Sequence, residues 1–89
     1  MRVIHACLDS TATLTTTTAV PLIHDLVWAH ARPSDGLEHV RARPASHDGF
    51  DVVLFVRARS HGTAQEQMHA LLDRVAGPAA VHGFTLRLT

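Results

Sequence analysis

The sequence predicts an α+β fold in which two helices cover one face of a four-stranded antiparallel sheet. Three observations predict it. The chain has 89 residues, which is the size of one domain. Its apolar residues recur at strand or helix spacing, and the segments follow the order strand, helix, strand, strand, helix, strand. We therefore expect a single domain over residues 1–89, with one face of its sheet left open.

The segment from Gly49 to Arg59 predicts a central strand, because it is β-branched and aromatic with charge only near its ends. A capping box over residues 63–66 then predicts the start of the second helix. The helix has one apolar stripe at helical spacing, and Gly77-Pro78 is expected to end it. The residues of the stripe are Ala64, Met68, Leu71, Leu72 and Val75.

The remaining strands are shorter or alternate less regularly. Arg2 to Leu8 predicts the first strand, Leu37 to Arg43 the second, and the strictly alternating segment from Phe84 to Thr89 the last.

The first helix is expected from Thr18 to Arg32, with Thr18 as its cap and Pro21 in its first turn. The run from Arg32 to Gly36 is expected to stop it. The threonine-rich stretch from Thr11 to Thr18 is compatible with a loop, a continuation of the first strand or a hairpin.

This order of elements in fewer than ninety residues resembles the ferredoxin-like plait, the βαββαβ sandwich. That fold hosts many unrelated functions. The resemblance therefore implies the architecture and no particular activity.

Composition narrows the class of protein. The apolar fraction of 46% is typical of a folded domain, and a formal net charge of zero gives no global attraction to nucleic acid or membrane. The single Cys7 excludes an intramolecular disulfide. The N-terminus does not resemble a signal peptide, and the longest apolar stretch, residues 19–31, is too short to span a bilayer. We expect a cytoplasmic protein.

The chain has eight arginines and eight histidines but no lysine, asparagine or tyrosine. The three missing residue types have A/T-rich codons. This bias is typical of a high-GC bacterial genome, such as that of an actinobacterium. A cluster of arginines is correspondingly weaker evidence of function here.

Strand alternation predicts an apolar centre on the open face with an arginine rim, which is the layout of a protein interface. The centre is formed by Val3, Cys7, Val53 and Phe55, and the rim by Arg41, Arg43, Arg57, Arg59 and Arg87. We expect homodimerisation through this face. Alternatively, the arginines bind an anionic ligand, as in a regulatory domain.

The segment 49–55 resembles the central strand of an RNA-recognition motif, which raises the question of RNA binding. Here His47-Asp48 replaces the basic start, Asp51 replaces a small residue and Val52 replaces a stacking aromatic residue. These departures and the neutral net charge argue against RNA binding.

The first helix carries a second candidate surface. A helical wheel places Ala19, Val20, Ile23, Leu26 and Val27 toward the sheet, with His30 among them. Trp28 falls on the opposite side with Pro21 and His24, and four-residue spacing allows Trp28 and His24 to stack. We therefore expect one of two arrangements: Trp28 is exposed and forms a contact surface, or the threonine-rich stretch folds over it.

The histidines match no metal motif, since neither an i, i+4 pair on a helix nor His-x-His occurs. We predict no catalytic residue, metal ion or cofactor. The expected function is that of a small non-enzymatic accessory protein that contacts a protein or small ligand. The alternative is a cofactor-free enzyme resembling ferredoxin-like polyketide monooxygenases and cyclases in size and fold, with His5, His30 or His39 as base.

Overall fold

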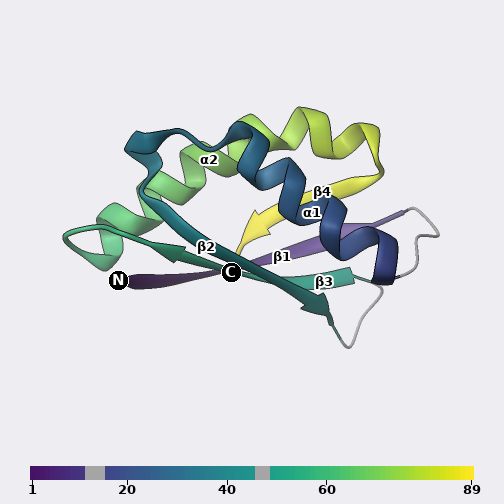
Figure 1. Cartoon of the computed structure of the whole chain (residues 1–89), viewed down its shortest axis with the longest axis horizontal. Helices are drawn as coiled ribbons and strands as arrows, with labels where there is room; N and C mark the ends of the chain where they lie inside the picture. The colour runs from purple at the N-terminus through teal and green to yellow at the C-terminus, as the bar shows by residue number, and fades with distance from the viewer. Residues whose placement is uncertain (12–15, 46–48) are drawn as a thin grey trace.

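The computed structural model describes residues 1–11, 16–45 and 49–89 (Figure 1). In this part of the chain the elements are β1 (Arg2–Ser10), α1 (Thr16–His30), the 3-10 turn η1 (Pro33–Asp35), β2 (Leu37–Pro44), β3 (Gly49–Val56), α2 (His61–Val81) and β4 (Phe84–Leu88). The strands form one antiparallel sheet in the order β2-β3-β1-β4. The predicted order and the α+β ferredoxin-like fold are therefore confirmed.

Both helices lie on the same side of the sheet and contact each other (Figure 1). The core lies between the sheet and the two helices, because alternate residues of each strand point toward the helices. On β3, Val52, Leu54 and Val56 are fully buried, whereas Val53 and Phe55 are only half-buried. Val3, Cys7, Val53 and Phe55 alternate with these buried residues, as predicted, whereas Arg57 and Arg59 lie beyond the end of β3. The buried strand residues are Ile4, Ala6, Leu8, Val40, Phe50, Val52, Leu54, Val56 and Phe84.

The helix α1 begins at Thr16, two residues before the predicted start, so Thr18 lies inside it and is not its cap. Pro21 is the sixth helical residue and removes one backbone donor. Burial of Ala19, Ile23 and Val27 against the sheet offsets this loss.

The threonine-rich stretch begins directly after β1, where the Thr11 amide donates to the Gly83 carbonyl at 2.9 Å. Residues 12–15 of this stretch lie outside the described residues, and Thr16 to Thr18 belong to α1.

Both predicted ends of α2 are wrong. The helix begins at His61 and its cap is Ser60, whose Oγ accepts from the Thr63 amide at 3.1 Å. At the other end it continues through Gly77-Pro78 to Val81. Gly77 lacks the Cβ that normally clashes with a following proline ring, and the extra turn buries Ala79. The chain reverses at Gly83, where φ is +79°.

The connection from α1 to β2 depends on Gly36. This residue has a φ of +69° and caps η1, and its carbonyl accepts from the Arg57 amide at 2.7 Å. A Cβ at this position would overlap the Arg57 carbonyl oxygen and approach the side-chain nitrogen of Gln67 to 2.9 Å. Glycine is therefore required here for both its conformation and its size.

We predict that Gly36→Ala lowers the free energy of unfolding by about 2–3 kcal/mol, since backbone strain and a backbone overlap add together. The measurement is urea denaturation followed by circular dichroism. Gly62→Ala is the matched control, because a Cβ there meets only Ser60 Oγ at 4.0 Å and the site is helical. An equal loss of stability in both variants would contradict the prediction.

Candidate functional site

The face of the sheet opposite the helices is formed by three rows of residues that run across the strands. The first row is His39, Phe55 and Val3, the second is Arg41, Val53 and His5, and the third is Arg43, Asp51, Cys7 and Arg87. We call these ten residues, with Asp9, the open face. It is apolar at the end where β1 begins and charged at the end where β3 begins.

The apolar end of the open face is partly exposed. Val3 is 39% exposed, and Val53 and Phe55 are half-buried. The His39 ring covers part of Phe55, with ring centroids 5.5 Å apart and a tilt of 48°. Phe55 therefore lies between His39 on β2 and Val3 on β1, and Val3, Val53 and Phe55 form one apolar patch.

The charged end of the open face holds both signs. Arg87 and Asp9 approach to 3.6 Å, and because both side chains are about half exposed or more, this pair contributes little to stability. Arg41 and Arg43 flank Val53 and Phe55 at a hollow of about 400 Å³. Among the residues that the structure describes, neither guanidinium group has an ion-pair partner.

Two predicted members of this face, Arg57 and Arg59, lie elsewhere. The strand β3 ends at Val56, three residues before the predicted end, so Arg57 and Arg59 leave the sheet. Arg57 instead bonds to Gly36 through its backbone and lines a hollow beside Trp28. The alternating pattern predicted a strand that continues to Arg59. In the structure the backbone of Arg57 bonds to Gly36, the residue that caps η1, and not to a neighbouring strand.

Trp28 lies on the exposed side of α1, as predicted, and is 38% exposed. Its ring does not stack on His24. Instead the indole Nε1 donates to His24 Nε2 at 3.2 Å, with the ring centroids 6.3 Å apart and tilted by 54°. This bond orients the indole from the preceding turn and leaves its other side open.

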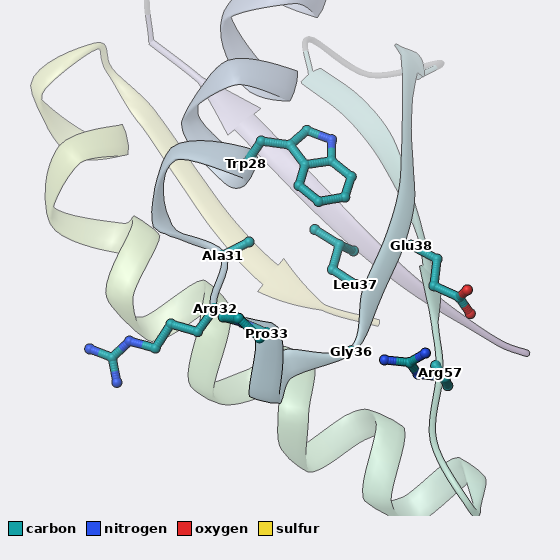
Figure 2. A pocket seen from close by; sticks show the side chains of 8 residues that line it. All are labelled: Trp28, Ala31, Arg32, Pro33, Gly36, Leu37, Glu38 and Arg57. Atoms are coloured by element: carbon teal, nitrogen blue, oxygen red, sulfur yellow. The ribbon is translucent and has the colours of Figure 1, made fainter.

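The open side of Trp28 borders a hollow of about 540 Å³ that we call the Trp28 hollow (Figure 2). Trp28, Ala31 and Leu37 supply its apolar lining (Figure 2). Arg57, the residue that follows β3, and Glu38 of β2 also line it, and the Glu38 side chain points away from Trp28 (Figure 2). Arg32, Pro33 and Gly36 complete it; the Arg32 side chain extends away from the other lining side chains (Figure 2).

The Trp28 hollow rests on a buried ion pair that the sequence analysis missed. Asp35 is 5% exposed, its carboxylate contacts the Arg74 guanidinium, and it accepts from the Arg32 amide at 2.7 Å. The Asp35 carbonyl accepts from the Gln67 side chain at 2.6 Å, and Arg74 Nε reaches the His30 carbonyl at 3.4 Å. Two of these bonds, from Arg74 and Gln67 to Asp35, tie the turn to α2, and the bond from Arg74 to His30 ties the end of α1 to the same helix.

A signal for this network exists in the sequence. Gln67 and Arg74 are seven residues apart, two turns of helix, and lie on the same edge of the apolar stripe of α2. Long polar side chains at that edge reach neighbouring turns. The sequence does not identify Asp35 as their partner, because an Asp in the turn after α1 is expected there whether or not it pairs with another segment.

The histidines considered as catalytic bases do not share one site. His5 and His39 lie on the open face, whereas the half-buried His30 ends α1 in the helical layer. Within residues 1–11, 16–45 and 49–89, no three His, Cys, Asp or Glu side chains gather in a group that could hold a metal ion.

Comparison with known proteins adds no family. No protein-family model and no curated protein matches the chain. No helix in the described part of the chain is long and apolar enough to cross a membrane.

We predict that Arg74→Ala lowers the free energy of unfolding by about 2–4 kcal/mol, because it leaves the buried Asp35 carboxylate without its counter-charge. Arg87→Ala removes the same side chain from the exposed pair with Asp9 and should cost at most about 0.5 kcal/mol. Urea denaturation of both variants measures the difference. Equal effects would show that the Asp35–Arg74 pair contributes no more than a surface pair.

Proposed function

We propose that this chain is a non-enzymatic binding protein that pairs with a second copy of itself through the open face. The observation that carries the proposal is the half-exposed apolar patch of Val3, Val53 and Phe55, bordered by charges of both signs. Apolar centres with a polar rim are typical of protein interfaces, and aromatic residues are enriched in them.

The balance of charge favours a second copy as the occupant. Arg41, Arg43 and Arg87 share the open face with Asp9 and Asp51, so the face carries both partners of an ion pair. An identical face can therefore supply carboxylates to arginines and arginines to carboxylates, as isologous pairing requires. A strongly basic or acidic partner would leave one set of these charges opposed by like charge.

The size of the sheet is compatible with a small interface. Four strands at about 4.8 Å spacing and eight paired residues at about 3.4 Å each give a flat area of roughly 500 Å². Side-chain relief increases the accessible area above this value. Specific interfaces start at about 600 Å² on each partner. Burial of Val53 and Phe55, already half complete in one copy, adds roughly 1 kcal/mol for each side chain.

A second candidate function is anion binding on the same face. Arg41 and Arg43 border the 400 Å³ hollow without an ion-pair partner among the described residues, and guanidinium groups bind phosphate or carboxylate. This candidate requires the hollow to be accessible in solution, whereas pairing of two copies covers it. The oligomeric state therefore separates the two functions.

We predict that the native protein sediments at twice the chain mass of 9.7 kDa, and that Phe55→Glu sediments as a single chain. The substituted carboxylate would be buried against apolar residues of the second copy, which is unfavourable. Val81→Glu is the matched control, since Val81 is 84% exposed at the far end of α2. It should leave the sedimenting mass unchanged.

A native protein that sediments as a single chain, or a Phe55→Glu variant that keeps the dimer mass, would overturn the pairing. In the first case, a titration with inorganic phosphate tests the second candidate. Heat of binding that disappears in Arg41→Ala would support anion binding on the open face.

A further inference from the structure

We propose that the Trp28 hollow and a second hollow beside it form one docking groove for an acidic peptide segment of a partner protein. The second hollow has a volume of about 480 Å³ and is reached across η1. The two hollows share Pro33, Gly36 and Arg57 in their linings. Together they extend from the indole of Trp28 to the start of α2, near Thr63.

The walls of the groove are held before any ligand binds. The indole of Trp28 is oriented by His24, and η1 is held to α2 by the buried pair of Asp35 and Arg74. The Arg57 backbone is bonded at its amide to Gly36 and at its carbonyl to Gln67, at 2.7 and 3.4 Å. Ordering these groups in advance reduces the entropic cost of binding.

The charge of the groove selects an acidic occupant. Its lining contains Arg57 and Arg59 against the single acidic residue Glu38, while the Arg32 side chain extends away from the other lining side chains (Figure 2). Among the described residues, the Arg57 guanidinium has no ion-pair partner. Because the chain as a whole is neutral, this excess of positive charge is local to the groove. It attracts carboxylates and disfavours a basic segment.

The apolar end of the groove selects one further feature of the occupant. Trp28, Ala31 and Leu37 offer a contact for a single aromatic or large aliphatic side chain, and Trp is a frequent centre of binding energy in interfaces. The expected peptide therefore combines one such residue with neighbouring Asp or Glu residues that reach Arg57 and Arg59.

The shape favours a peptide over a small molecule. Small-molecule pockets enclose about 70–90% of the surface of their ligand. Here both hollows are open to solvent, and Trp28 itself stays 38% exposed. An extended segment gains contact along the length of a shallow groove, while a small molecule placed in either hollow would remain largely hydrated.

This inference deepens the proposed binding function by naming a partner, and it uses a different surface from the open face. The groove is formed by the end of α1, η1, the start of α2 and the adjoining ends of β2 and β3. Pairing of two copies and peptide binding can therefore succeed or fail separately.

The test begins with selection from a displayed library of random nonapeptides on the immobilised full chain. We expect enrichment of peptides that carry Asp or Glu beside an aromatic or large aliphatic residue. The affinity of a fluorescein-labelled selected peptide is then measured by anisotropy. Arg57→Gln and Trp28→Ala should each weaken binding about tenfold or more. Melting temperatures establish that both variants are folded.

The matched control is Arg43→Gln, which removes the same charge from the open face. Screening by salt makes its expected effect on the affinity less than about twofold. Phe55→Glu should bind the peptide as tightly as the native chain, whatever its sedimenting mass, so this arm separates the groove from the dimer.

The proposal is overturned by enrichment of neutral or basic peptides or by the absence of enrichment. It is also overturned if Arg43→Gln weakens binding as much as Arg57→Gln. Displacement of the peptide by phenylacetate at similar affinity would identify a small-molecule carboxylate site instead, and would likewise overturn it.

Discussion

The buried charge of Asp35 constrains more of this molecule than any other single group. Its carboxylate is almost inaccessible to water, and a buried charge without a partner costs several kcal/mol. Arg74 must therefore reach it from α2, which sets how η1 lies against that helix. Gln67 binds the same turn two helical turns earlier. This attachment also positions the neighbouring segments. The strand β2 begins directly after Gly36, whose carbonyl accepts from the Arg57 amide at close range. Arg74 also donates to the His30 carbonyl at the end of α1.

A domain of this size has enough apolar residues for one core layer, and both helices lie on the same side of the sheet. That arrangement leaves two surfaces with unusual properties. The open face has half-exposed apolar residues on the side of the sheet away from the helices. The groove beside Trp28 contains Arg57, whose guanidinium has no ion-pair partner among the described residues. Both features have a physical origin in the fold. They differ in what holds them, since the groove is held by side-chain bonds whereas the open face is held by the hydrogen bonds of the sheet.

The sequence predicted the layers well because each layer is encoded locally. Alternation on β3 separates Val52 and Leu54 from Val53 and Phe55, and burial follows that alternation. The ends of the elements were predicted poorly. Gly77-Pro78 is a common helix stop, yet α2 continues through it because the next turn buries Ala79. The gain from burying a residue in the core depends on neighbours from distant segments, which local patterns do not contain.

The same distinction applies to the candidate sites. The sequence by itself determined the fold class, the apolar centre of the open face and the position of Trp28 off the buried stripe of α1, since each depends on periodicities within one segment. Only the tertiary structure decided that Arg57 belongs to the groove and that Asp35 pairs with Arg74, 39 residues away. Pairing of distant polar groups depends on where the chain brings them together. No spacing within a segment specifies that meeting, and so the groove emerged only from the folded chain.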